Sequence, residues 1–182
     1  MLRKIGKRIK KTNRKNEILS AAIEVFAEIG YYRATTAKVA ERASISQPYI
    51  FKFFSSKEEL LLNALQLSWE RIIKSFRKTV EITSADKLEW ELIEAYEEIL
   101  RSYKSEILLQ MQSQTIPDDS IRTEMQRGGF REVNSLVVDA FKEANIENSE
   151  ERAFLFLARG MLCNVSMALD MPELLHKKRG DK

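Results

Sequence analysis

The chain has 182 residues, of which 44% are hydrophobic and 31% charged, so it is too apolar for a disordered tract and long enough for a buried core. Its 6 Gly and 3 Pro are about 5% of the chain, against roughly 12% in average proteins, which favours long helices over a many-stranded β fold. One Cys and one His exclude an internal disulfide and the usual zinc site. No apolar run reaches the ~20 residues that span a bilayer, and no secretory signal is recognisable. We therefore expect a cytoplasmic protein without a metal or other cofactor.

Charge divides the chain into two parts. Residues 1–57 carry 13 Lys and Arg against 4 Glu, whereas residues 58–182 carry 17 Lys and Arg against 23 Asp and Glu. Eight of the cations lie within residues 1–15, which contain no acid. Such a basic arm is typical of contact with a polyanion. A solvated tail and an amphipathic arm on a membrane surface remain alternatives.

Apolar spacing predicts three short helices over residues 16–54. The first covers 16–29 and stops at Gly30, because a helix C-terminus favours a residue with positive φ. The second is short and is capped by Thr35 or Thr36.

The third predicted helix follows a four-residue break and covers Gln47 to about Phe53, with Ser46 as its N-cap and Pro48 in its first turn. This separation of two helices is typical of a helix-turn-helix unit, whose second helix presents its first residues to base edges in the DNA major groove. Gln can bond adenine, and Tyr can reach a phosphate or a thymine methyl. The leading residues here are Ser46, Gln47, Pro48 and Tyr49, followed by Lys52. A helical hairpin that only packs remains an alternative.

The rest of the chain is predicted to be helical as well. A capping box of Ser56 and Glu59 begins a long helix over 57–82. Further helices are expected over 86–103, 106–115, 118–144 and 149–170. The predicted organisation is a basic arm (1–15), a helix-turn-helix domain (16–56) and a C-terminal helical domain (57–182).

Residues 18–65 resemble the N-terminal DNA-binding domain of the TetR family of bacterial repressors. The features that carry this resemblance are Val25-Phe26, Gly30, Thr35-Thr36, Ser46 with Tyr49, Ile50 and Phe51, Phe53-Phe54, and Ser56-Lys57-Glu58-Glu59-Leu60. The resemblance implies an all-α fold, with an N-terminal three-helix DNA-binding domain and a C-terminal helical domain for ligand binding and dimerisation. It also implies a transcription regulator and not an enzyme.

The resemblance further implies which residues contact DNA. Thr36 and Lys57 would bind phosphates at helix N-termini, and Gln47, Pro48 and Tyr49 would lie against bases. With the basic arm included, the expected set is Arg14, Lys15, Thr35, Thr36, Ser46, Gln47, Pro48, Tyr49, Lys52, Phe53 and Lys57.

Three positions depart from the family pattern. Ser44 replaces the common turn Gly, Pro48 stands where many members have Gly, and Phe51 replaces the usual Tyr. Without a hydroxyl, Phe51 is not assigned a phosphate contact. We expect it to lock the third helix in place together with Phe54.

A palindromic operator and a homodimer formed through the last two helices are expected, because operators are usually two-fold symmetric. Several small residues, namely Gly128, Gly129, Ala158, Gly160 and Cys163, would allow close helix approach. A lipophilic effector is expected between the C-terminal helices, although aromatic and Met residues at this spacing usually belong to a core. The candidate ligand-binding residues are Trp69, Ile72, Phe76, Trp90, Tyr96, Tyr103, Gln110, Met111, Gln114, Phe130 and Asn134.

Three functions remain open at this point. The first is a dimeric repressor that a small molecule releases from its operator. The second is a DNA-binding regulator of the same fold without such an effector, controlled by a protein partner or activating transcription. The third is an all-helical enzyme or a membrane-surface adaptor.

Overall fold

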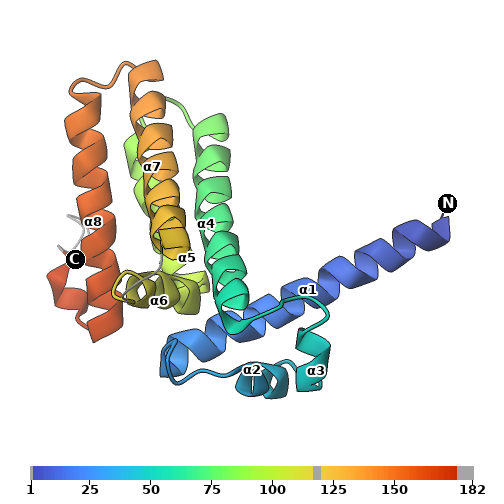
Figure 1. The fold of residues 1–182 in the computed structure, drawn as a ribbon. Helices are drawn as coiled ribbons and strands as arrows, with labels where there is room; N and C mark the ends of the chain where they lie inside the picture. Colours follow the sequence, from blue (N-terminus) through green and yellow to red (C-terminus); the bar gives the residue numbers. More distant parts are fainter. Residues whose placement is uncertain (1, 117–119, 176–182) are drawn as a thin grey trace.

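The computed structural model describes residues 2–116 and 120–175, with the backbone alone at 2–12 and 120–122. This part of the chain is built from helices and connecting turns, as the all-α prediction requires (Figure 1). His176, the one histidine of the chain, lies outside the described residues. So do Asp118 and Asp119, with which the predicted helix over 118–144 begins. The helices are α1 (Leu2–Ile29), α2 (Thr36–Arg42), α3 (Gln47–Ile50), α4 (Lys57–Ile82), α5 (Leu88–Ser102), α6 (Lys104–Ser113), α7 (Ser120–Glu143) and α8 (Ser149–Leu169), followed by the 3₁₀ turn η1 (Pro172–Leu174).

Helix α1 begins at Leu2, so the prediction of a helix start near Asn16 was wrong. Lys and Arg are good helix formers, and the helix continues through them although only Leu2, Ile5 and Ile9 mark it with apolar side chains. From Asn13 on, where side chains are described, the first buried residue is Ile18, at which the main run of apolar spacing starts. The N-terminal part of α1 therefore projects beyond the rest of the molecule as a helical rod (Figure 1).

The turn between α2 and α3 keeps helix-turn-helix geometry although it lacks the common glycine. Ser44 takes a left-handed conformation with φ 53°. Its N–H donates to the carbonyl of Glu41 at 3.0 Å, and the N–H of Ile45 donates to that of Ala40 at 3.0 Å. These two bonds form a Schellman motif that closes α2. At the other end of α2, Thr35 is the N-cap and accepts a bond from the N–H of Lys38.

Helix α4 begins as the capping box predicts, with one difference. Ser56 Oγ accepts a bond from the N–H of Glu59 at 3.1 Å. The Glu59 carboxylate, however, accepts bonds from the N–H and the hydroxyl of Ser55, one residue earlier than expected. These bonds hold the pKa of Glu59 below its ordinary value.

Two apolar cores lie along α4. The first buries α1, α2, α3 and the first turns of α4, and it includes Leu109 from α6. The second is formed by the rest of α4 together with α5, α6, α7 and α8. A single continuous helix, rather than a flexible linker, therefore joins the N-terminal helices to the C-terminal bundle.

Phe51 does not belong to the first core, which contradicts the prediction that it locks α3 in place. Phe54 is buried as expected, with 1% of its surface exposed, and Ile50 is completely buried. Phe51, the C-cap of α3, is 49% exposed, because it lies on the same side of the helix as the exposed Gln47 and Pro48, four and three residues earlier.

Candidate DNA-binding surface and effector cavity

The first residues of α3 form an exposed surface that α2 supports from the side. Ser46, Gln47 and Pro48 are all exposed. Gln47 Nε2 donates a hydrogen bond to Thr36 Oγ1 at 2.9 Å, so the first turns of α2 and α3 are joined through side chains. The structure thus brings together Thr36, Gln47 and the residues around them, as a base-reading helix requires.

Tyr49 and Phe53 lie on the inner side of this surface. Both are half-buried, and their ring centroids are 5.5 Å apart in an edge-on arrangement. Lys52 places its ammonium group 4.9 Å from the centroid of the Tyr49 ring. The Lys52 ammonium is therefore held near α3. Tyr49 is less exposed than Gln47 and Pro48, the first residues of the helix.

Lys57 has a structural role in addition to the expected position at the start of α4. Its ammonium donates to the carbonyls of Tyr31 and Ala34, at 3.1 and 3.3 Å, and lies 4.2 Å from the Tyr31 ring centroid. The Tyr31 hydroxyl donates to Glu58 at 2.7 Å, which lowers the pKa of that carboxyl. Lys57 thus fixes the turn between α1 and α2 as well as adding positive charge.

Arg14 and Lys15, the two basic-arm residues expected at the DNA, are not gathered with α3. Arg14 pairs with Glu17 on the same helix. Lys15 donates to Asn63 Oδ1 of α4 at 2.8 Å and lies 5.4 Å from the Phe54 ring centroid. In this structure both cations are engaged along α1 and α4.

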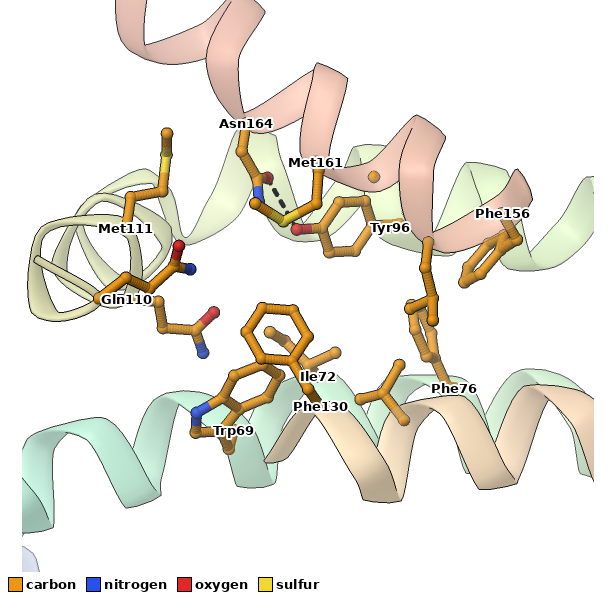
Figure 2. A pocket seen from close by; sticks show the side chains of 14 residues that line it. Trp69, Ile72, Phe76, Tyr96, Gln110, Met111, Phe130, Phe156, Met161 and Asn164 are labelled. Carbon is orange, nitrogen blue, oxygen red and sulfur yellow. Dashed lines mark hydrogen bonds between the residues drawn. The ribbon is translucent and has the colours of Figure 1, made fainter. Parts of the chain in front are cut away.

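A small cavity of about 40 Å³ lies inside the bundle, between α4, α5, α6, α7 and α8. Figure 2 shows the side chains that project into this space from these helices. None of the lining residues carries a charged side chain. They are Trp69, Ile72, Phe76, Tyr96, Gln110, Met111, Gln114, Phe130, Val133, Phe156, Leu157, Gly160, Met161 and Asn164.

The polar groups at the cavity are neutral, and those of Tyr96 and Asn164 are hydrogen-bonded to each other. The Tyr96 hydroxyl donates to Asn164 Oδ1 at 2.7 Å (Figure 2). Burial raises the pKa of Tyr96 to about 12, and the bond to Asn164 opposes that shift. The phenol therefore stays protonated at physiological pH, and the cavity suits an apolar, uncharged group.

A buried polar network anchors the indole of Trp69 beside the cavity. Trp69 Nε1 donates to Gln126 Oε1 at 3.0 Å, and Gln126 Nε2 donates to the carbonyl of Gln110 and to the hydroxyl of Ser113. Gln110 Nε2 in turn donates to Ser68 Oγ at 2.9 Å. Helices α4, α6 and α7 are thus joined at one end of the cavity.

Eight of the eleven expected ligand-binding residues line this cavity, and three do not. Trp90 and Asn134 lie on exposed faces of α5 and α7. Tyr103 follows the last turn of α5, where its ring stacks 4.9 Å from the Arg71 guanidinium. The apolar stripe of a helix continues past the cavity at both ends, so the spacing of apolar residues does not show which of them line the cavity.

Sequence reasoning missed six lining residues, all on α7 and α8. They are Val133, Phe156, Leu157, Gly160, Met161 and Asn164. The last helix is apolar on more than one face and was assigned to dimerisation. The signal that could have found them is the second stripe of α8, which repeats at 156–157, 160–161 and 164.

Helix α6 touches both the cavity and the DNA-binding domain. Gln110 and Met111 line the cavity, whereas the neighbouring Leu109 is buried in the N-terminal core. Gln112 Nε2 donates to the carbonyl of Ala27 near the end of α1 at 2.8 Å. Helix α6 therefore contacts the cavity on one side and α1 on the other.

Helix α8 has an exposed apolar stripe on the side away from the cavity. Leu155, Leu162, Val165 and Leu169 are between 36% and 61% exposed. Among the described helices, α8 alone is long and apolar enough to cross a bilayer by length and composition, with 28% of that stretch buried. Its Arg152 and Arg159 pair with Glu89 and Glu97 of α5, which holds α8 within the bundle.

Comparison with known proteins identifies the N-terminal domain. The family model for "Bacterial regulatory proteins, tetR family" matches residues 18–64. This is a TetR-family domain. The transcriptional activator FasR of Mycolicibacterium smegmatis is 34% identical over 82 residues, which are 45% of this chain and 37% of FasR. The fatty acid metabolism regulator of Bacillus subtilis is 28% identical over 74 residues, 40% of this chain and 38% of that protein. The matches thus span less than two fifths of either relative.

Solved TetR-like regulators share the fold over most of the chain. The fatty acid degradation regulator FadR of Bacillus halodurans has a TM-score of 0.71 at 18% identity, over 86% of this chain and 89% of that one. FadR of Bacillus subtilis, solved with stearoyl-CoA, has a TM-score of 0.68 at 18% identity, over 86% and 88%. AibR, solved with isovaleryl coenzyme A and operator DNA, has a TM-score of 0.70 at 15% identity, over 93% and 90%.

Two glycines that were expected to serve dimerisation in this TetR-like bundle instead make room for aromatic rings at the cavity. A Cβ atom at Gly129 would come within 2.2 Å of the Trp69 indole. At Gly160 it would come within 3.3 Å of the Tyr96 ring. At Gly128, by contrast, nothing lies within 4 Å.

This difference predicts opposite effects for adjacent substitutions. We expect Gly129→Ala to lower the free energy of unfolding by about 1–3 kcal/mol, because the rigid indole must shift. The matched control Gly128→Ala should raise it by about 0.5–1 kcal/mol, since Gly weakens a helix interior. Urea titration followed by circular dichroism measures both. Similar changes in the two variants would show that the indole does not press on Gly129.

Proposed function

We propose that the chain is a dimeric transcriptional repressor that binds a palindromic operator and is released from it by a lipophilic small molecule. We place it in the cytoplasm, together with its operator DNA. The observation that carries the proposal is the exposed start of α3, supported by Thr36 within a TetR-family domain. Residues 1–57 add 13 cations against 4 acids, and phosphate neutralisation supplies most non-specific affinity for DNA.

Sequence-specific binding is tested with a duplex enriched from a random library. Gln47→Ala should weaken binding by about 1–3 kcal/mol and relax the preference for that duplex over random competitor, because a bidentate base contact is lost. The matched control is Gln66→Ala, an exposed glutamine of α4 that bonds Glu70. Fluorescence anisotropy at fixed salt measures both variants. If Gln47→Ala keeps the affinity and selectivity of the unmodified protein, α3 does not read the bases.

The exposed stripe of α8 supports a homodimer. Leu155, Ala158, Leu162, Val165 and Leu169 follow one another at alternating intervals of three and four residues, which is the spacing of a left-handed helix pair. Burying such a stripe against a second copy removes apolar surface from water. The last helix, with α7 beside it, is thus the proposed dimer interface.

Leu162→Lys should convert the dimer into a monomer and reduce operator affinity at least tenfold, because a charge enters the centre of the stripe and the two half-sites are no longer bound together. Glu81→Lys, on the exposed end of α4, is the control that adds positive charge elsewhere. Sedimentation velocity measures the mass of each. A dimeric Leu162→Lys protein would place the interface on another surface.

The proposed effector is the acyl part of an acyl-coenzyme A. Two TetR-like neighbours were solved with such molecules, stearoyl-CoA and isovaleryl coenzyme A. The uncharged lining here fits an acyl chain and a thioester and excludes the charged nucleotide. At about 40 Å³ the cavity is smaller than the roughly 300 Å³ of ordinary ligand pockets, so binding must move the lining side chains.

Such a movement would reach the DNA-binding domain through α6. A ligand shifts a conformational equilibrium only by its differential affinity for the two states. Opening the cavity displaces Gln110 and Met111, and Leu109 and Gln112 on the same helix pack against the other domain. The conformation with an expanded cavity and the conformation that binds DNA would therefore exclude each other, and the ligand would favour the first.

A panel of acyl-CoA esters from short to long chain tests the effector. At 100 times its Kd the preferred ester should add about 2.7 kcal/mol to the stability, raise the melting temperature and weaken operator binding. Coenzyme A alone is the control ligand, and Met161→Trp, which fills the cavity, should abolish the shift. A panel without any shift would favour a regulator of the same fold that lacks a small-molecule effector.

Transcriptional activation is the second candidate function. FasR, which matches 45% of this chain, is named an activator. The DNA-binding surface is compatible with either outcome, because the position of the operator relative to the promoter decides the sign. A promoter fusion assayed with and without the protein separates repression from activation.

A further inference from the structure

Phe51 is a large apolar side chain that the DNA-binding domain leaves uncovered next to α3. It is 49% exposed, whereas Ile50 beside it is completely buried. A single exposed Phe is ordinary in a protein surface. Phe51, however, lies at the end of the helix that carries Gln47, so its exposed ring bears on what this helix contacts.

The backbone places Phe51 on the same face as the leading residues of α3. Phe51 has helical dihedral angles, φ −66° and ψ −6°, and is the C-cap of the helix. It lies three residues after Pro48 and four after Gln47, and residues at those intervals share one helix face. All three are exposed, and the opposite face is buried through Ile50.

The Gln47 amide is held in a defined orientation on this face. Its nitrogen donates one N–H to Thr36 Oγ1 at 2.9 Å. An amide group has a second N–H and a carbonyl oxygen, which together match the N7 acceptor and N6 donor of adenine. Thr36 thus acts as a positioning residue for a side chain suited to an A·T pair.

Phe51 offers the same groove a purely apolar contact. It has no group that can bond a phosphate or a polar base edge. The apolar feature of the major groove is the 5-methyl group of thymine. Tyr49 is less able to reach that methyl, because its ring is half-buried against Phe53.

We propose that Phe51 packs on the 5-methyl group of a thymine in each operator half-site, next to an adenine read by Gln47, so that this face selects A·T pairs. This inference rests on the proposed operator binding. The positive charge of Lys52, held beside α3 over the Tyr49 ring, favours DNA as the occupant over an apolar protein surface.

The experiment uses the full chain and the duplex enriched from a random library. Each thymine in turn is replaced by deoxyuridine, which removes only the methyl group. At one position in each half-site, removal of a methyl should weaken binding about fourfold. Phe51→Ala should bind the thymine and deoxyuridine duplexes equally, and Phe51→Tyr, which keeps the ring, should restore the discrimination.

Tyr32→Ala is the matched control. Tyr32 is another exposed aromatic of this domain, 66% exposed, but it lies between α1 and α2. Its removal should leave the methyl discrimination intact. Circular dichroism confirms that each variant is folded, and Phe51→Leu serves as a second apolar variant that should retain part of the discrimination.

The outcomes separate this inference from the function on which it rests. If no duplex is enriched, the proposed sequence-specific DNA binding fails, and the Phe51 contact fails with it. If a duplex is enriched but no thymine methyl affects binding, the Phe51 contact is overturned while DNA binding stands. The same holds if methyl discrimination persists in Phe51→Ala.

Discussion

The proposed coupling between the cavity and the DNA-binding surface depends on the packing of α6 between two cores. Leu109 is buried in the N-terminal core, and Gln110, the next residue, belongs to the hydrogen-bonded network beside the cavity. Because one turn of a close-packed helix carries both side chains, the proposal is that a change in one environment strains the other. The bond from Gln112 to the carbonyl of Ala27 adds a polar contact to this apolar one.

The cavity and the DNA-binding surface are built in opposite ways. The cavity is lined without charge, is nearly filled by its own side chains, and depends on Gly129 for the space that Trp69 occupies. The surface of α3 is exposed, and one hydrogen bond donated by Gln47 to Thr36 orients its leading side chain. The cavity is therefore suited to a change of shape on binding. The surface of α3 is suited to recognising a partner without a change of shape.

Most of the fold could be predicted from the sequence, because helices with an apolar stripe, capping residues and scarce turns leave strong local signals. Eight of the expected ligand-binding residues line the cavity because they lie on one stripe of α4, α5, α6 or α7. The true start of α1 was missed, since only three apolar residues, Leu2, Ile5 and Ile9, mark a helix among the Lys and Arg of residues 1–15. The exposure of Phe51 and the cavity face of α8 were missed because they depend on which side of a helix meets its neighbours.

The uninterrupted course of α1 gives its basic end a mechanical connection to the rest of the protein. A helix of 28 residues is about 42 Å long at roughly 1.5 Å per residue. Its residues from Ile18 onward are packed in the first core, and Lys15 bonds Asn63 of α4, while residues 2–14 extend beyond them. The projecting part would act as a lever about 24 Å long, in which a tilt of about 5° of the packed part sweeps the outer end through about 2 Å. Small adjustments deep in the bundle would thus be amplified at the far end of the rod, where eight cations are concentrated within the first fifteen residues.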